Sequence, residues 1–526
     1  MAPPGPIDEL SSAELVALVT ALLGKVADLE RTVSAQRDEI ARLKNLKGPP
    51  SIKPSGMEQA TSGKRSGPKH GRRGPKPASR VVVEDRDLSP EMTPTERAGA
   101  RFKGYQHYLV QNLVISPQTI RYRRERWVTA DGRTVTAPLP AGIRGHFGPE
   151  LCRFVLTQYH QCQVTIPRLV AELRSIGIAI SKRQVMRLLN EGQESFLVEA
   201  RDVLRSGLAT APWLTVDDTG ARHKARNGYC TQIGNDHFTS FATTGSKSRL
   251  NFLQLLRGGY TDYVINQDAL HYMRERALSG PVIRQLADHP VRYFADHAAW
   301  LGHLERLGIA PLTVTPNPLL IASEGALWGS IRAHGFLDKT VIVSDGAGQF
   351  EVGQHASCWI HSERLVHKLD GFNQHDREAQ QHIRSLIWNY YRDLKAYRDN
   401  PSQTRRISLR ARFDRIFRRR TGAVMLDRLL RRIHANRHDL LMVLDRPEIP
   451  LHTNGSENDI RCYVTKRKIS GGTRSDAGRD TRDAFLGIAK TCAKLGFTFW
   501  DYLGDRLQVA GAAAIPCLPM IVAARA

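Results

Sequence analysis

The 526-residue sequence lacks the marks of a secreted or membrane-spanning protein. No basic stretch followed by an apolar core stands at its N-terminus, so we expect no signal peptide. Its longest apolar stretch, 509–524, is interrupted by Pro516 and Pro519 and falls short of the roughly 18 uninterrupted apolar residues that span a bilayer. The seven cysteines are scattered and form no C-x-x-C pair, unlike a disulfide framework. We therefore expect a protein of a reducing compartment with no membrane partner.

Acidic residues are few beside the basic ones. The chain has 76 Lys and Arg against 52 Asp and Glu, a formal net charge of +24. Such an excess favours a polyanionic partner, nucleic acid first. Hydrophobic residues make up 41% of the chain, which is typical of a folded protein, and the length predicts two or more domains.

Two segments near the N-terminus predict self-association and an extended connection. Apolar residues from Val19 to Leu43 recur at steps of three and four, which predicts a coiled coil within 1–52. The alternative is one amphipathic helix folded onto its own chain. Residues 53–80 are rich in Gly, Pro, Lys and Arg and predict a basic disordered linker. This linker follows a phosphate backbone or serves only as a solubilising spacer.

The next two segments predict a small β-containing domain and a helix-turn-helix. Within 81–160, alternating residues around Asp131-Gly132 predict a hairpin. Within 161–206, Gly177 separates two amphipathic helices, and Ser181 is placed to cap the second. Lys182 and Arg183 then begin the second helix and become candidate DNA contacts. A plain helical hairpin is the other interpretation.

The rest of the sequence indicates an α/β core with acids after two apolar strands. Strands at 213–216 and 340–343 are followed by Asp217 and Asp345. If these strands are neighbours, about 4.8 Å apart, their carboxylates can share a divalent cation. A third acid, Glu457, completes a site for two ions that promote attack on a phosphodiester. Without metal, at least one of these carboxyl groups should have a raised pKa.

Position alone does not single out these acids, since an Asp after a strand is most often a turn former or helix cap. Other acids compete with them, and Asp268, which follows the apolar run 263–265, is a rival to Asp345. The remaining rivals are Asp218, Asp262 and Glu324.

An ordered set of short motifs resembles the transposase of bacterial insertion-sequence family 66. The motifs are VDDTGAR at 216–222, SDGAGQF at 344–350, CWIH at 358–361, HTNGSENDIRCYVTKRK at 452–468, SGGTRSDAG at 470–478 and AKTCAKLGFTFWDYL at 489–503. The resemblance implies a multidomain α/β protein: an RNase H-like catalytic core with an α-helical insertion, preceded by the coiled coil and the helix-turn-helix. The core then consists of 207–259, 339–370 and 447–506, with the basic helical insertion at 371–446 and a C-terminal tail at 507–526.

Carried over residue by residue, the resemblance implies an Asp-Asp-Glu triad. Its members are Asp217, Asp345 and Glu457, which would bind two Mg²⁺ or Mn²⁺ ions. Asp345 is chosen over Asp268 because the Cys-x-x-His motif lies shortly downstream only there. The supporting residues are Asp218, Cys358, His361 and Asn454. Two ligands do not make a zinc site; Cys358 and His361 are expected to pack against and orient the second Asp, with acid/base work by His361 as a minor alternative.

The sequence departs from the family pattern at two places. The family's N-terminal region usually carries a cysteine-rich zinc-binding segment, but residues 81–145 contain no cysteine, so we expect no zinc. Residues 260–338 intervene between the two aspartates, where the family commonly has a short link. This insertion indicates either an extra module or a divergent subgroup of the family.

Basic side chains are expected to contact DNA. Residues 371–446 hold 18 Lys and Arg against eight Asp and Glu. The candidates are Lys182, Arg183, Arg418, Arg419, Arg420, Arg461, Lys466, Arg467 and Lys468. For each phosphate that these side chains neutralise, the slope of log binding constant against log salt concentration should become more negative by about 0.9.

The sequence thus predicts a bacterial, cytoplasmic, DNA-associated transposase. It would bind terminal inverted repeats, hydrolyse phosphodiester bonds to free 3′-OH ends and join them to target DNA. It would assemble as a homo-oligomer through the coiled coil and could use helper proteins of the same element. The alternatives are a catalytically silent, transposase-derived DNA-binding protein and an RNase H-like nuclease on branched DNA.

Overall fold

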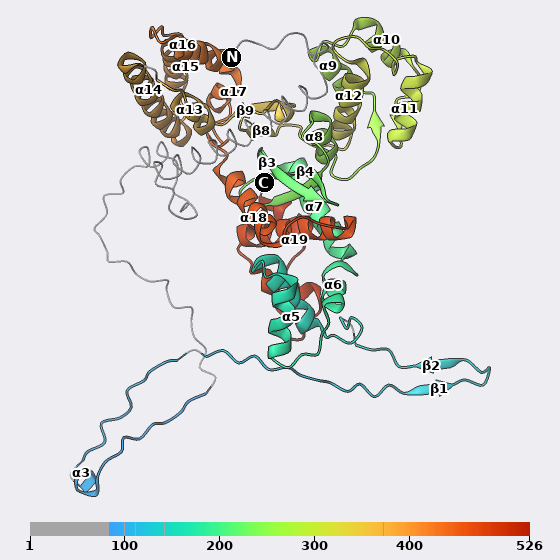
Figure 1. Cartoon of the computed structure of the whole chain (residues 1–526), viewed down its shortest axis with the longest axis vertical. Helices are drawn as coiled ribbons and strands as arrows, with labels where there is room; N and C mark the ends of the chain where they lie inside the picture. Colours follow the sequence, from blue (N-terminus) through green and yellow to red (C-terminus); the bar gives the residue numbers. More distant parts are fainter. Residues whose placement is uncertain (1–83, 99, 111, 141, 372, 526) are drawn as a thin grey trace, which may run out of the picture. The chain divides into compact units, whose positions relative to one another are not determined.

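A five-stranded mixed sheet lies at the centre of the fold. The structure, a computed structural model, describes residues 84–98, 100–110, 112–140, 142–371 and 373–525 (Figure 1). The predicted coiled coil and the basic linker lie outside these residues. The strand order is β5 (Thr239–Thr244), β4 (Arg226–Gly234), β3 (Trp213–His223), β8 (Val341–Ser344) and β9 (Gln354–Ser357).

The sheet has an antiparallel half and a parallel half. β3, β4 and β5 form an antiparallel meander, whereas β8 runs parallel to β3, and β9 runs parallel to β8. The expected neighbourhood of the strands that lead to Asp217 and Asp345 is therefore confirmed. One expectation was wrong: β3 does not end before Asp217 but continues to His223, because its second half pairs with β4.

Side chains of β3 alternate between two faces of the sheet. Leu214 and Val216 enter the main hydrophobic core. Ala221, on the opposite face, packs in a smaller cluster with Tyr463 and Leu486. These two residues belong to α18 (Asn454–Ser470) and α19 (Asp476–Leu495), so both helices cover the face of β3 that also carries Asp217.

The segment before the core is largely exposed. β1 (Arg126–Val128) and β2 (Thr134–Thr136) pair as the expected hairpin, and α3 (Pro94–Ala98) precedes them. No described residue between 84 and 140 is buried, so the domain expected at 81–160 has no core in this part of the structure. Packing begins instead at α4 (Pro149–Leu156), whose Cys152 and Val155 join the main core.

The two helices expected around Gly177 are present. They are α5 (Ile166–Ser175) and α6 (Lys182–Asn190), and Gly177 adopts a φ of 91° in the turn between them. Ser181 and Gln184 form a reciprocal capping box at the start of α6. A short π-helix, η2 (Thr157–Gln161), leads into this pair, and α7 (Glu194–Thr210) leads from it to β3.

Two mainly helical segments lie between the strands and helices that pack around the central sheet. After α8 (Arg249–Leu256), the first consists of β6 (Tyr263–Val264), α9 (Gln267–Glu275), α10 (Gly280–Asp288), β7 (Tyr293–Phe294), α11 (His297–Arg306) and α12 (Pro318–Ala333). The second follows η3 (Gly348–Phe350), β9 and α13 (Trp359–His367); it consists of α14 (Gln374–Asp399), α15 (Gln403–Phe417), α16 (Val424–Ala435), α17 (Arg437–Leu441) and η4 (Met442–Leu444).

The chain's last described segment packs onto the core. α20 (Phe499–Arg506) is followed by α21 (Leu518–Arg525), which lies against α7 and buries Leu518 and Val522. Among the described helices, none combines the length and apolar character that crossing a bilayer requires.

Candidate functional site

The parallel register brings two of the predicted acids level with each other. Thr215 of β3 is the partner of Val343 of β8, the last pair of that ladder. Two residues further along, Asp217 lies within β3, and Asp345 directly follows the end of β8. Adjacent strands are about 4.8 Å apart, so both carboxylates lie at one edge of the parallel half of the sheet.

Asp217 has the electrostatic signature expected of a crowded carboxylate site. The pKa of Asp217 is raised to about 6, mainly by burial and in smaller part by the negative charges of Asp345, Asp218 and Glu457. A hydrogen bond from the backbone N–H of Asp218 to Asp217 Oδ1, at 2.8 Å, partly opposes the shift. The charges of Asp345 and Glu457 therefore both act on Asp217, and the expected rise of one carboxyl pKa is found at Asp217.

Asp218 projects from the opposite face of β3 and already has partners. Lys247 Nζ lies 2.8 Å from its Oδ1, and Gln349 Nε2 donates to its Oδ2 at 2.8 Å. The side chain is only 7% exposed. Gln349 belongs to η3, which follows Asp345, so Asp218 connects η3 to β3.

A buried hydrogen-bond relay supports the turn that carries Asp345. Ser344 Oγ lies 2.8 Å from His355 Nε2, and His355 Nδ1 lies 2.7 Å from Asp439 Oδ2. Because a carboxylate only accepts, His355 Nδ1 carries the proton and its Nε2 accepts from Ser344. Ser344 Oγ in turn accepts from the Gly346 N–H at 3.1 Å. The relay links β8, β9 and α17 behind an exposed Asp345.

Glu457 lies in the first turn of α18 and is held by cations. Arg364 of α13 donates to its Oε1 at 3.1 Å, and Arg461, one turn further along α18, lies 3.6 Å from its Oε2. His361 Nε2 is 3.6 Å from Oε1. Asn454, expected to support the site, is the first residue of α18.

Cys358 and His361 connect the second and third acids. Cys358 N donates to the Ser344 carbonyl oxygen at 2.8 Å, and Trp359 N donates to that of Leu451 at 3.0 Å. Burial opposes ionisation of Cys358, but the His361 imidazole outweighs it and lowers the pKa of the thiol. Burial likewise opposes protonation of His361, and Cys358 outweighs it and raises the pKa of the imidazole. The Cys-x-x-His motif thus packs between the segments that carry Asp345 and Glu457.

The donor chemistry at Asp217 suits a hard divalent cation, because a cation would offset the carboxylate repulsion that, after burial, contributes to its raised pKa. In the described residues, however, no three His, Cys, Asp or Glu side chains are close enough together to hold a metal ion. One physical reason that the acids do not gather is the ion pair between Glu457 and Arg364, which holds the Glu457 carboxylate. The rival acids have partners of their own: Asp262 with His334, Asp268 with Arg332 and Glu324 with Tyr272.

Most of the candidate DNA contacts are accessible, with one exception. Lys182, Arg183, Lys468 and the run 418–420 are exposed, and Arg461 and Arg467 are half-buried. Lys466 is 0% exposed, so the expectation that it contacts DNA is wrong. Its ammonium donates to the Tyr159 carbonyl oxygen at 2.7 Å and lies 3.4 Å from the centre of the Tyr159 ring.

Sequence reasoning missed the side chains that hold the acids in place. Lys247 and Arg364 contact Asp218 and Glu457 from distant parts of the chain, and no local motif signals either contact. The burial of Lys466 did have a signal. Ser456, Ile460 and Tyr463 precede it at helical spacing and are all buried, so Lys466 falls on the inner face of α18.

Together these features define an α/β protein whose mixed sheet presents a carboxylate site bordered by cations. The sequence model described as "Transposase IS66 family" matches residues 144–274 and 332–481, just over half of the chain. The chain therefore belongs to the IS66 transposase family. The unmatched residues between these ranges fall within the first insertion, in agreement with the sequence interpretation. A protein of Sinorhizobium fredii named "Uncharacterized protein y4jO" is 49% identical over 324 residues, which are 62% of this chain and 100% of that protein.

Proposed function

We propose that this transposase binds the terminal inverted repeats of its element, hydrolyses phosphodiester bonds to free 3′-OH ends and joins these ends to target DNA. Membership of the family supports a transposase role with DNA as partner. The observation that carries the catalytic part is the register of β3 and β8, which brings Asp217 and Asp345 level and within the electrostatic reach of Glu457. The order of an antiparallel meander followed by two parallel strands supports an RNase H-like core.

In this proposal Asp217, Asp345 and Glu457 bind two Mg²⁺ or Mn²⁺ ions. When bound, such ions polarise the phosphodiester and stabilise the attacking and leaving oxygens of an in-line displacement. The chain's own part is to hold the carboxylates in place. Asp217 is fixed by the rigid sheet, Asp345 by the Ser344 relay, and Glu457 by the first turn of α18. Glu457 must exchange Arg364 for a cation on the way to the active arrangement.

Other surfaces would position the DNA. Lys182 and Arg183 are exposed at the start of α6, which supports a role in contacting DNA, and the exposed run 418–420 adds positive charge on the second insertion. Arg461 and Lys468 extend the basic surface along α18. Pairing of two ends through the predicted N-terminal coiled coil, helper proteins of the element and a cytoplasmic location complete the proposal.

A cleavage assay with matched acid variants tests the site. Duplex carrying the element's end is incubated with wild type, Asp345→Asn, Glu457→Gln and, as control, Asp268→Asn, in Mg²⁺ or Mn²⁺. We expect the first two variants to bind DNA but to lose cleavage by at least 100-fold, whereas Asp268→Asn keeps it. Full cleavage by Asp345→Asn would refute the assignment of the second acid.

The same assay separates the alternatives. Binding of the ends without metal-dependent cleavage by the wild type would identify a catalytically silent DNA-binding protein. Preferential cleavage of branched DNA over duplex ends would identify a nuclease of the same fold.

A further inference from the structure

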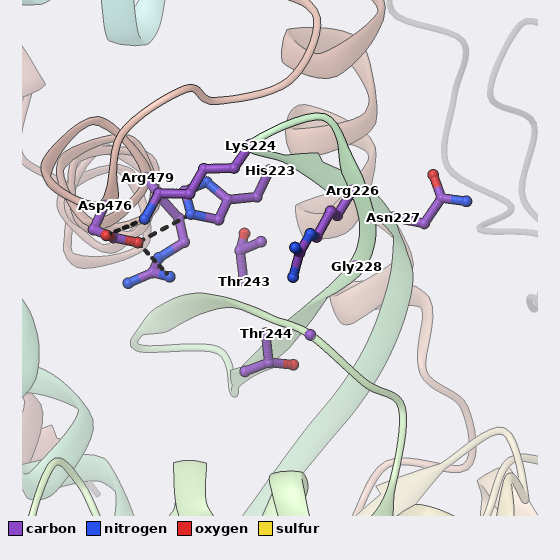
Figure 2. A pocket seen from close by; sticks show the side chains of 10 residues that line it. His223, Lys224, Arg226, Asn227, Gly228, Thr243, Thr244, Asp476 and Arg479 are labelled. Carbon is purple, nitrogen blue, oxygen red and sulfur yellow. Dashed lines mark hydrogen bonds and ion pairs between the residues drawn. The ribbon is translucent and has the colours of Figure 1, made fainter.

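A cavity of about 660 Å³ lies beyond the carboxylate site, at the far end of β3. The turn between β3 and β4 forms one wall with His223, Lys224 and Arg226, and α19 forms another with Asp476 and Arg479 (Figure 2). The end of β5 closes it. Gly228 lies at this point because a Cβ there would come within 2.6 Å of the Thr244 carbonyl oxygen.

The charges in the cavity do not cancel. Asp476 is the one carboxylate of the lining, and it is shared by His223 at 3.0 Å, Arg479 at 3.3 Å and Lys224. The Arg226 side chain makes no hydrogen bond or ion pair to any described residue, and the residue is exposed. Arg479 also pairs with Asp480, 2.8 Å from its Nε, so Lys224, Arg226 and Arg479 face the two carboxylates of Asp476 and Asp480, which leaves one positive charge in excess. An exposed guanidinium without a partner suits a phosphate group.

The lining also argues against a small organic ligand. Its side chains are polar or charged, and it includes Gly228 and Gly245 but no aromatic or aliphatic residue beyond them. Binding pockets for such ligands are lined predominantly by hydrophobic and aromatic side chains. A phosphate within a nucleic-acid strand needs no apolar surface, because its affinity comes from charge neutralisation.

The position of the cavity relates it to the carboxylates. His223 is six residues from Asp217 on β3, about 20 Å at the usual strand rise, and an even separation places both on one face of the strand. α18 runs alongside β3 between these two residues. Near its start, the charge of Glu457 acts on Asp217. Just past its end, Thr473 forms a β-bridge with His223. Between these ends, Asn458, Arg461, Thr465 and Lys468 form one stripe at helical spacing, with Arg461 half-buried and the others exposed.

We propose that this cavity binds a backbone phosphate of the DNA strand that enters the carboxylate site, about six nucleotides from the bond that is cut. The distance follows from a rise of about 3.4 Å per nucleotide over about 20 Å. Arg226 is the principal contact, Lys224 and Arg479 add charge, and the stripe on α18 guides the strand between the two points. The inference rests on the proposed function, because it takes DNA as the substrate.

The test compares Arg226→Gln with Arg284→Gln in the full-length chain. Both substitutions remove one exposed arginine without a partner among the described residues; Arg284 lies on α10 in the first insertion. We expect Arg226→Gln to weaken binding of end-containing duplex roughly tenfold at low salt and to make the log–log salt slope less negative by about 0.9. Arg284→Gln should match the wild type.

A second measurement locates the phosphate. Duplexes are prepared with one neutral methylphosphonate at successive positions of the cut strand. Wild type should lose affinity when the neutral linkage lies about six nucleotides from the cut, and Arg226→Gln should show no further loss there. Equal behaviour of Arg226→Gln and wild type in both measurements, with DNA binding intact, would overturn the cavity assignment alone. Equal loss in both arginine variants would also overturn it, whereas a wild type that binds no duplex overturns the proposed function as well.

Discussion

His355 joins Asp439 of the second insertion to the turn that carries Asp345, with 2.7 Å between its Nδ1 and the carboxylate. Its other nitrogen contacts Ser344, the residue directly before Asp345. Both His355 and Ser344 are buried, so this is a fixed connection. The helical insertion is thereby coupled to the position of a proposed catalytic carboxylate.

We expect Asp439→Ala to lower the cleavage rate by about 10–100-fold with little change in DNA affinity, because the relay positions Asp345 and does not contact DNA. Asp439→Asn, which keeps an acceptor oxygen, should recover much of the rate. The measurements are single-turnover cleavage and duplex binding for both variants. If Asp439→Ala and Asp439→Asn lowered the cleavage rate equally, or if DNA affinity fell as much as the cleavage rate, a positioning role would be contradicted.

Local patterns in the sequence predicted the elements that depend on neighbouring residues. Gly177, Ser181 and the apolar spacing gave both helices α5 and α6, since capping and periodicity act within a few turns. Two apolar strands followed by acids predicted that Asp217 and Asp345 could share a cation if the strands were neighbours, and the register confirms that the strands are neighbours. The motif order was needed to choose Asp345 over Asp268.

Contacts between distant segments could not be predicted from the sequence. The ion pair of Arg364 with Glu457 and the relay through His355 to Asp439 join elements 93 and 84 residues apart. Nothing in their local sequence marks them, because such contacts depend on how the helices pack. β3 was predicted too short for a related reason: the pairing with β4 stabilises strand structure beyond the apolar run.

The ion pair of Arg364 with Glu457 should compete with divalent cations. We expect Arg364→Gln to bind Mn²⁺ more tightly than wild type, because it removes the cation 3.1 Å from the carboxylate while leaving Arg461 in place. Calorimetric titration with Mn²⁺ in the absence of DNA measures this. Glu457→Gln with Arg364→Gln is the control, and it should show no gain. Unchanged Mn²⁺ affinity in the single variant would show that Glu457 is not a ligand.

Lys466 should make stability depend on pH. Burial, with a smaller contribution from Arg482, lowers its pKa from 10.5 to about 7, while Cys462 acts in the opposite direction. Between about pH 7 and 10 the unfolded chain therefore binds a proton that the folded chain does not. The free energy of unfolding should rise with pH across this window, by at most ~1.4 kcal/mol per pH unit from this group.

Lys466→Met isolates that contribution. The variant has no titrating ammonium, so its stability relative to wild type should be greatest near pH 6 and should fall by a few kcal/mol towards pH 9. Urea unfolding of both proteins at several pH values gives the difference. The variant lacks the hydrogen bond to the Tyr159 carbonyl oxygen at every pH. This loss changes the stability difference by the same amount at each pH and does not change its pH dependence. A difference that stays constant with pH would show that Lys466 remains charged in the fold.

Gly329 sets how closely α12 approaches β6 in the first insertion. A Cβ at this position would overlap the Val264 carbonyl oxygen and lie 2.9 Å from Ala269 Cβ, and its own carbonyl accepts from Asn266 at 2.9 Å. We expect Gly329→Ala to destabilise the protein by about 1–3 kcal/mol, because backbone on both sides must move apart. Gly302→Ala is the matched control. Its Cβ would meet only the end of Arg306, so the better helix propensity of Ala should leave stability unchanged or raise it by up to ~1 kcal/mol. Urea unfolding separates the two variants, and equal stabilities would show that α12 and β6 are not in close contact in solution.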